Sequence, residues 1–512
     1  MVASLLRVLH GGIQDSRLLP PRGKPNIDMF RVVIPRAGRF TTQWVRLDFD
    51  TRPQFGSKAT LTVPVKGQLL NRLFLVATMP DITSAQEAAK AQVGPTLFLG
   101  PNFTWTNSLG HALIQGASVE IGGSTVESLD GRLMEVLDEF YTPLERVELV
   151  NRLIRRNMTN FPQYPPPTNT QVVTPLPFWF CRGDAGVFLP IDALAADSVR
   201  ISITFNSVDT LYVSTARLDL SGNKCLSKGA AFYALQGATF YAQDPSGNPV
   251  PGLNGNPNQT TNASGIGGIQ LPNRLALQDT YLLAEYTYLD APEANRFRIS
   301  DIEVPIIQHY AFEPVETQRA PRVSIPLRIA NPVRNLFFFA QRVEAPQFNA
   351  LFLATRDLSG DGVTTVPWWP NAAPINARAP GNLQPGFVFR DSEPLASAEL
   401  MYEGKLMRYS STSPVLFRSI LPALEMKKAP YVNRYYYMMH FGLNHGALPP
   451  SQPNGEGNLD KITRIALNLE FKPFRGSVTL TQVPNYNVYV WAETYNVFRV
   501  YGGRGGLLFA YP

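Results

Sequence analysis

The chain reads VPVKGQLLNRLFLVA from Val63 to Ala77, and a related stretch, IPLRIANPVRNLFFFA, runs from Ile325 to Ala340. The prolines of the two stretches are 326 − 64 = 262 residues apart, and the closing alanines are 340 − 77 = 263 residues apart. One inserted residue therefore aligns the two stretches. A repeat of this kind indicates that one half of the chain duplicates the other.

Two further pairs of segments repeat in the same order along the chain. Ala117–Ile121 (ASVEI) recurs as Ala396–Leu400 (ASAEL), and Ser198–Phe205 has a counterpart in Arg464–Phe471. A duplicated all-β unit explains the three pairs. Chance similarity between amphipathic strands is the alternative explanation.

Apolar and polar residues alternate along several stretches, which is the pattern of half-buried β-strands. Clear examples are Ala59–Val65, Val199–Phe205 and Ile465–Phe471. About eight such strands in each half, joined by long loops, predict two tandem eight-stranded antiparallel jelly rolls (a double jelly roll), in which two sheets pack on one core. The predicted fold class is therefore all-β, with short inserted helices and long loops.

One region has helical spacing instead. Apolar residues between Leu129 and Phe140 recur every three or four positions, which predicts a helix over 128–140. Thr142-Pro-Leu-Glu145 then has the form of a capping box, with proline at the first helical position, and predicts a second helix over 143–156.

Domain boundaries follow from the repeat and from the polarity of the chain between its halves. The polar, proline-containing segment Asp290–Phe297 follows the last strand expected in the first half, so it is the predicted linker. We expect an N-terminal arm at 1–26, a first jelly roll at 27–295 with an insertion at about 216–278, and a second jelly roll at 296–512.

The composition is typical of a large, loop-rich β protein. Charged residues make up 17% of the 512 residues, against roughly 25% in an average protein, and there are 44 prolines. Disorder is excluded because 44% of the residues are hydrophobic. We find no secretion signal and no run of 18 apolar residues, and the two cysteines, Cys181 and Cys225, favour a reducing compartment.

Basic residues are concentrated at the N-terminus. Residues 1–50 hold eight basic and four acidic groups, a surplus of +4 in a chain whose net charge is +6. This segment is either a solvated leader or an arm that lies on an anionic membrane, nucleic acid or protein face. The candidate residues of such an assembly arm are Arg7, Arg17, Arg22, Lys24, Arg31 and Arg36.

Motifs for catalysis and cofactor binding are absent from the sequence. The five histidines lack metal-ligand spacing, and no G-x-S-x-G elbow or dinucleotide-binding glycine pattern occurs. We therefore predict no enzyme, no metal and no cofactor, and we expect the tripeptide Arg182-Gly183-Asp184 and the aromatic run Tyr435–Tyr437 to be structural. Four Asn-x-Ser/Thr sequons are glycan candidates, which we expect to be chance matches without secretion: Asn102, Asn157, Asn258 and Asn262.

The segment Asn487–Ala510 resembles the last strand and tail of the double jelly-roll major capsid proteins of nucleocytoplasmic large DNA viruses. Tyr495-Asn-Val497 and Gly505-Gly-Leu507 match the pattern of that family, whereas Trp491–Thr494 departs from it mildly. Other segments resemble the family in the same order, and the likeness runs from about residue 27 to 512. They are Gln54–Lys58, Leu69–Leu73, Val119–Gly123, Phe178–Phe180, Gly186–Pro190 and Asp197–Ile201.

This resemblance implies a structural capsid protein that has no catalytic activity and no cofactor. Three copies would form a pseudo-hexagonal capsomer of six jelly rolls, and capsomers would tile an icosahedral shell in the virion, assembled in the host cytoplasm. The implied partners are the homotrimer, neighbouring capsomers, minor capsid proteins and an internal membrane beneath the arm, with no sequence-specific contact to nucleic acid. One departure is the insertion at about 216–278, which is long for the family.

Two other functions are compatible with the sequence. A minor capsid or other jelly-roll shell protein would share the fold and differ in its copy number in the particle. A carbohydrate-binding jelly-roll module would need clustered exposed aromatic residues in its loops, for which Trp368-Trp369 is the candidate.

Overall fold

The structure is a computed structural model, and it describes thirteen stretches of the chain. They are residues 39–81, 103–156, 171–214, 239–241, 268–270, 276–343, 345–348, 350–356, 392–404, 406–431, 434–443, 453–473 and 483–509.

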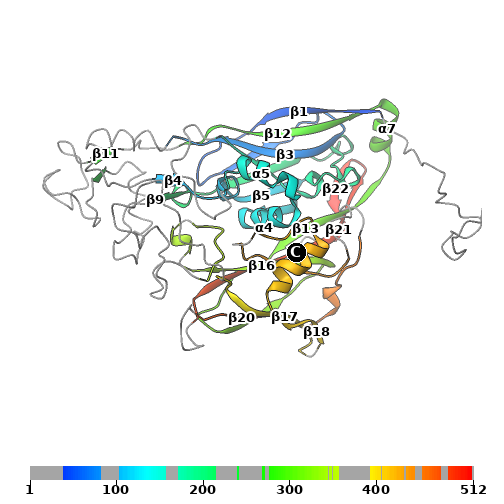
Figure 1. The fold of residues 1–512 in the computed structure, drawn as a ribbon. Helices are drawn as coiled ribbons and strands as arrows, with labels where there is room; N and C mark the ends of the chain where they lie inside the picture. Colours follow the sequence, from blue (N-terminus) through cyan, green and yellow to red (C-terminus); the bar gives the residue numbers. More distant parts are fainter. Residues whose placement is uncertain are drawn as a thin grey trace, which may run out of the picture. The chain divides into compact units, whose positions relative to one another are not determined.

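Each half of the chain builds a sandwich of two antiparallel sheets (Figure 1). The first sheet of the N-terminal sandwich contains, in spatial order, β1 (Phe40–Asp48), β12 (Gln278–Leu289), β3 (Leu69–Thr78) and β7 (Gln171–Pro175). Its second sheet contains β2 (Lys58–Thr62), β8 (Val199–Phe205), β5 (Ile114–Ile121) and β6 (Ser124–Asp130).

The C-terminal sandwich repeats this arrangement. Its first sheet contains β13 (Ile302–Ala311), β21 (Tyr486–Tyr501), β16 (Val333–Arg342) and β19 (Tyr437–His440), and the short strands β14 (Val315–Glu316) and β22 (Arg504–Leu507) also pair with β21. Its second sheet contains β15 (Arg322–Leu327), β20 (Ile465–Phe471), β17 (Leu395–Tyr402) and β18 (Leu406–Thr412).

The three repeated sequence pairs occupy equivalent strands. Val63–Ala77 and Ile325–Ala340 lead into and form β3 and β16, the third strand of each sandwich. Ala117–Ile121 and Ala396–Leu400 lie in β5 and β17, and the last pair forms β8 and β20. The eight strands of the two main sheets of each sandwich can be counted in chain order, without the short additional strands. Both sandwiches then have the same spatial order, which is 1-8-3-6 in one sheet and 2-7-4-5 in the other. The predicted double jelly roll is confirmed.

In the described part of the chain the helices lie between strands. They are α3 (Leu109–Leu113), α4 (Gly131–Tyr141), α5 (Leu144–Leu153), α7 (Ala291–Ile299) and α8 (Leu421–Glu425), and a wider helical turn at Leu416–Ile420 runs into α8. Smaller elements are the pairs β4 (Phe103–Trp105) with β9 (Tyr212–Ser214) and β10 (Thr239–Tyr241) with β11 (Gly268–Gln270), and single 3₁₀ turns at Trp179–Cys181, Ala185–Val187, Ile191–Ala193, Val208–Thr210, Ala345–Phe348 and Leu459–Lys461.

Three local predictions need correction. The helix predicted from residue 128 starts at Gly131, because pairing with β5 keeps β6 extended as far as Asp130. The capping box is wrong: the hydroxyl of Thr142 hydrogen-bonds the Asp138 carboxylate at the end of α4 and does not cap α5. The predicted linker is helical, since α7 occupies most of it and Asp290 caps its first backbone nitrogen at 2.9 Å.

Burial follows the strand pattern except where the two sandwiches meet. Alternate residues of β20 are buried and half-buried, as expected for a strand with one face on a core. All ten residues of β16 are buried, because one face packs on the C-terminal core and the other on the N-terminal sandwich. The buried hydrophobic residues of both halves accordingly form one continuous cluster, and the described residues from Thr41 onward belong to one compact unit.

Candidate functional site: the seam between the two sandwiches

The two sandwiches meet along a contact that we call the seam. The N-terminal sandwich contributes β6, α4 and the segments around Arg156 and Arg182. The C-terminal sandwich contributes β13, β16, β21, Lys428 and Arg434. Figure 1 shows α4 in the middle of the structure, near β13 and β16. The seam decides how one sandwich is held against the other, and it is therefore the candidate functional site.

The seam begins where β6 ends and α4 starts. Asp130 Oδ1 accepts a hydrogen bond from the backbone nitrogen of Leu133 at 2.7 Å, which caps the helix. The other carboxylate oxygen, Oδ2, accepts a hydrogen bond from Trp491 Nε1 in β21 at 2.9 Å. One carboxylate therefore fixes both the start of α4 and the position of β21 against it.

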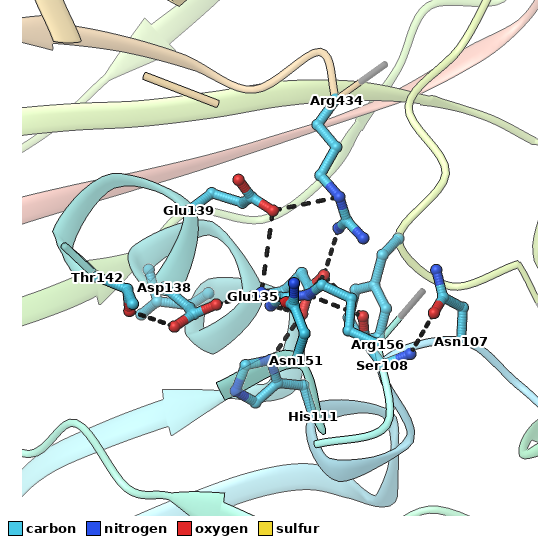
Figure 2. A network of polar contacts seen from close by, with 12 residues as sticks. Asn107, Ser108, His111, Glu135, Asp138, Glu139, Thr142, Asn151, Arg156 and Arg434 are labelled. Atoms are coloured by element: carbon cyan, nitrogen blue, oxygen red, sulfur yellow. Dashed lines mark hydrogen bonds and ion pairs between the residues drawn. The ribbon is translucent and has the colours of Figure 1, made fainter. Parts of the chain in front are cut away.

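Glu135, in the middle of α4, is the centre of the polar contacts in Figure 2, which we call the Glu135 network. Its Oε2 lies 2.5 Å from Arg156 Nη2 and 2.6 Å from His111 Nδ1. Ser108 Oγ donates to Oε1 at 2.8 Å, and Nη1 of Arg434, from the C-terminal sandwich, donates to the same oxygen. All five side chains are buried.

Two further carboxylates of α4 belong to this network. Arg156 donates to Asp138, and Glu139 lies 3.2 Å from Arg434 Nε and 3.3 Å from Lys428 Nζ. The network thus balances three carboxylates against three cations, which are Glu135, Asp138 and Glu139 against Arg156, Lys428 and Arg434.

Burial by itself opposes ionisation of a carboxylate and raises its pKa. For Glu135 the positive charges of Arg156 and Arg434, together with the hydrogen bond to His111, outweigh burial and hold the pKa well below its ordinary value. Arg156 likewise outweighs burial at Asp138 and lowers the pKa of that group. Both carboxylates are therefore ionised at neutral pH and depend on the neighbouring cations.

Two of the three cations, Lys428 and Arg434, come from the C-terminal sandwich. Without them α4 would bury three carboxylates against Arg156 alone. A buried charge that loses its partner costs several kcal/mol, whereas an intact buried pair adds little net stability over an apolar one. The intact Glu135 network therefore adds little to the free energy of unfolding. Its main effect is that displacing one sandwich along the other would cost several kcal/mol, because buried carboxylates would lose their cations.

A second group of charged and polar side chains, which we call the Glu493 cluster, lies on β21. Glu493 Oε1 is 2.9 Å from Arg182 Nη1, and Oε2 accepts from the Tyr141 hydroxyl at 2.7 Å and from Asn335 Nδ2 at 2.6 Å. His309 Nε2 is 3.4 Å from Oε1. Arg182 and Tyr141 belong to the N-terminal sandwich, so Glu493 is held from both sides of the seam.

The Glu493 cluster is electrostatically similar to the Glu135 network. Burial raises the pKa of Glu493, but the charges of Arg334 and Arg182 and a hydrogen bond from His309 hold it well below the ordinary value. Burial, together with the adjacent charge of Glu493, raises the pKa of the Tyr141 hydroxyl, which therefore remains a hydrogen-bond donor. His309 continues the cluster to Glu127, whose Oε1 lies 3.1 Å from Nδ1.

Aromatic rings also pack across the seam. The ring centroid of Phe337 in β16 lies 5.3 Å from that of Phe140 and 6.3 Å from that of Tyr141. The guanidinium of Arg132 lies 4.7 Å from the ring centroid of Tyr489 in β21. These contacts add a dry, apolar component to the seam, in which the carboxylates are shielded from water.

The structure places several residues noted in the sequence in or near the seam. Arg182 of the Arg182-Gly183-Asp184 tripeptide binds Glu493, and Asp184 accepts a hydrogen bond from the backbone nitrogen of Gly186, so the tripeptide is structural as expected. The aromatic run Tyr435–Tyr437 is buried in and before β19, also as expected. Among the residues that the structure describes, no group of three His, Cys, Asp or Glu side chains could hold a metal ion.

Other predicted residues lie outside the described part of the chain. They are the arm residues Arg7, Arg17, Arg22, Lys24, Arg31 and Arg36, the sequon residues Asn102, Asn157, Asn258 and Asn262, and Trp368-Trp369. Of the insertion at 216–278, the structure describes 239–241, 268–270 and 276–278. Within the described ranges, no helix is long and apolar enough to cross a membrane.

The charged residues of the seam were not among the residues predicted from the sequence. A usable signal was present, because Glu135 and Glu139 interrupt the apolar positions of a helix, most of whose other residues are also buried. Glu493 likewise stands in the middle of β21, within a run of buried residues that includes Val490, Trp491 and Ala492. A charged residue on a buried face indicates a partner of opposite charge, although it does not tell which residue that partner is.

Two family models match the chain, one in each half. The family described as "Major capsid protein N-terminus" matches residues 28–237, and the family described as "Large eukaryotic DNA virus major capsid protein" matches residues 295–506. The chain is 24% identical over 519 residues to the major capsid protein of Pyramimonas orientalis virus, and this similarity covers 100% of both chains. It is 22% identical to the major capsid protein of Phaeocystis pouchetii virus, again over 100% of both.

A shorter match joins the chain to "Probable capsid protein 4" of Acanthamoeba polyphaga mimivirus, with 28% identity over 216 residues that cover 41% of this chain and 39% of the relative. Solved structures share the fold. The chain in the quasi-atomic PBCV-1 virus capsid has a TM-score of 0.63 and 17% identity, with 94% of this chain and 100% of that one covered. The Faustovirus major capsid protein has a TM-score of 0.60 and 12% identity, with 97% and 96% covered.

Proposed function

Since this chain belongs to the major capsid proteins of large eukaryotic DNA viruses, with family models matching both of its halves, we propose that three copies of it form one capsomer of six sandwiches. The protein is a structural component of the virion capsid and not an enzyme. In this proposal neighbouring capsomers tile an icosahedral shell, which is assembled in the host cytoplasm.

The seam is the observation that carries this proposal. It joins two sandwiches of the same strand order through two buried, charge-compensated groups centred on Glu135 and Glu493. A chain held in this way acts as a rigid block of two equivalent units, and closed rings of identical subunits are the usual way in which such blocks associate. Three blocks supply the six units of a hexagonal tile.

Sedimentation equilibrium of the purified full-length protein tests the trimer. We expect a mass of three times 56.8 kDa in buffer of near-physiological salt, with no dimer at intermediate concentrations. A mass of 56.8 kDa at every protein and salt concentration tried would contradict the proposal. Relative copy number in purified particles then distinguishes a major from a minor shell component.

We further propose that residues 1–26 form an arm, 27–295 the first jelly roll and 296–512 the second. The arm would use its basic residues to bind an anionic partner inside the shell, either the headgroups of an internal membrane or an acidic face of a minor capsid protein. The surplus of +4 charges in residues 1–50 supports this role.

Replacing Arg7, Arg17, Arg22 and Lys24 together with Ser is expected to leave the trimer intact and to weaken particle assembly or vesicle binding. Anionic and neutral vesicles, compared by co-sedimentation, distinguish a membrane partner from a protein one. The control replaces Arg298 on α7 and Arg499 on β21, two basic residues outside the arm, with Ser. Unchanged particle yield and unchanged vesicle binding in the arm variant would refute a role for the arm.

A further inference from the structure

The helical segment that connects β18 with β19 leaves an apolar stripe in solvent. Ile420 and Leu424 are four residues apart, which places them on one face of the continuous helix 416–425, while Leu416, one turn earlier, is half-buried against the core. Ile420 is 48% exposed and Leu424 is 69% exposed. Large aliphatic side chains at this spacing are normally turned toward a core or an interface.

The equivalent helix of the N-terminal sandwich is covered. Helix α4 connects the same two strand positions, β6 and β7, and nearly all of its residues are buried. What covers α4 is the outer face of the first sheet of the C-terminal sandwich, where Phe337 and Trp491 contact its end and its start. The seam therefore joins the connecting helix of one sandwich to the outer sheet face of the next.

The matching sheet face of the N-terminal sandwich is open. Trp44 is 43% exposed, Phe74 and Leu283 are half-buried, and the rings of Trp44 and Phe74 lie 5.7 Å apart. Val173 and Pro175 of β7, also half-buried, pair with Val76 and Phe74 on the same sheet. We call these residues of β1, β3, β12 and β7 the open face.

Strand register makes the open face the counterpart of the face buried in the seam. Phe74 pairs with Leu283 in the N-terminal sandwich, and Phe337 pairs with Trp491 in the C-terminal one. Phe74 and Phe337 are 337 − 74 = 263 residues apart, the same separation as Ala77 and Ala340 at the ends of the two repeated stretches. Two residues earlier in each third strand, Arg72 pairs with Glu285 and Asn335 pairs with Glu493. These four buried residues of the C-terminal face, Phe337, Trp491, Asn335 and Glu493, thus have equivalents on the open face.

We propose that the helix 416–425 of one copy of this chain docks on the open face of a second copy, so that the intermolecular contact repeats the internal seam. The occupant of each surface is a second copy because the chain itself contains both halves of the contact and uses the same pairing internally. The inference rests on the proposed trimer, for which it identifies the contact surfaces.

The contact is head-to-tail, because the helix and the open face belong to different sandwiches of the chain. Contacts of this type close into rings or continue as filaments. Internal seams and intermolecular contacts would alternate around a ring of sandwiches, so each sandwich would have the same two types of neighbour. This explains why α4 and β16 are buried within one chain while Ile420 and Leu424 of the equivalent helix and Phe74 of the equivalent strand keep exposed area.

A mixing experiment tests the contact directly. The helix variant carries Ile420→Glu and Leu424→Glu, and the face variant carries Trp44→Glu and Phe74→Ser. Each is expected to be monomeric, with trimer association weakened at least about 100-fold, since a carboxylate would be buried in an apolar contact. Mixed together, the two should form a 1:1 heterodimer, because the intact helix of the face variant meets the intact open face of the helix variant.

Sedimentation and chemical cross-linking of each variant and of the mixture measure these masses, after thermal unfolding and near-ultraviolet circular dichroism have shown that the variants fold. Trp44→Glu alone replaces the face variant if Phe74→Ser prevents folding. The matched control is Ile299→Glu on α7, an 83% exposed aliphatic residue outside both surfaces, which should keep the wild-type mass.

Two results would overturn the proposal while the wild type remains a trimer. They are a trimeric mass for either folded variant, and a mixture that stays monomeric by both methods. A monomeric wild type would instead refute the proposed capsomer. The two failures are therefore distinguishable in the same experiment.

Discussion

Replacing Arg434 with Met is expected to lower the free energy of unfolding by about 3–5 kcal/mol, the cost of removing one partner from a buried ionic group. Arg434 neutralises Glu135 and Glu139 across the seam, and its side chain is only 1% exposed. Met retains most of the packing volume of the arginine side chain. The decrease in the free energy of unfolding therefore measures mainly the cost of leaving Glu135 and Glu139 without this cation. Denaturant unfolding, or the shift in melting temperature at one protein concentration, measures the effect.

The matched control is Arg298→Met. Arg298 Nε lies 2.8 Å from Asp192 Oδ2, but its side chain is 52% exposed, so the pair contributes about 0–1 kcal/mol. If both variants changed stability by the same amount, the Glu135 network would have no special role in the seam. Both arginines contact carboxylates of the N-terminal sandwich and the chemical substitution is the same, so the two variants differ mainly in the burial of the ion pair.

A double variant separates charge imbalance from lost packing. Arg434→Met leaves three carboxylates against two cations in the network, and adding Glu139→Gln restores a balance of two against two. We expect the double variant to be more stable than the sum of the two single effects predicts, by about 1–2 kcal/mol, as coupled neighbours show. Simple additivity would indicate that the charges act independently.

Phe337→Ala is expected to lower the free energy of unfolding by about 3–5 kcal/mol, because it removes a fully buried ring and leaves a cavity. The ring packs on Phe140 and Tyr141 of the N-terminal sandwich, so the cavity opens inside the seam. The two sandwiches should therefore unfold less cooperatively, which calorimetry detects as a broader or divided transition.

Phe74→Ala is the control that the duplicated fold supplies. Phe74 holds the equivalent position in β3 but is half-buried and faces outward beside Trp44. In the monomeric helix variant its removal should cost less than about 2 kcal/mol, since less apolar area leaves the core. Equal losses at the two positions would show that the seam is no better packed than the open face.

Much of the fold was predictable because it depends on local patterns. The alternation in Val199–Phe205 and Ile465–Phe471 gave the bounds of β8 and β20, and the repeated stretches mark equivalent strands. Helix boundaries were less accurate, since they depend on competing partners. Asp130 caps α4 only because pairing with β5 holds it extended, and Thr142 hydrogen-bonds Asp138 instead of capping α5.

The charged residues of the seam were not predictable as a set. Arg434 and Glu135 are 299 positions apart, and Arg182 and Glu493 are 311 apart, so no spacing rule relates them. A buried glutamate indicates that a cation lies nearby, but only the packing of α4 on the C-terminal sandwich selects Arg434 among the basic residues.

By itself, the sequence determined the class of the fold, the duplication and the resemblance to a capsid family, because periodicity and repeated motifs are properties of neighbouring residues. The tertiary structure alone decided which copy of each repeated element is covered. Helix α4 and β16 are buried against each other, while the helix 416–425 and the face around Phe74 remain open. The physical reason is that each sandwich has a connecting helix and an outer sheet face, and within one chain only one helix can pack on one face. Which helix and which face become buried depends on how the two sandwiches meet.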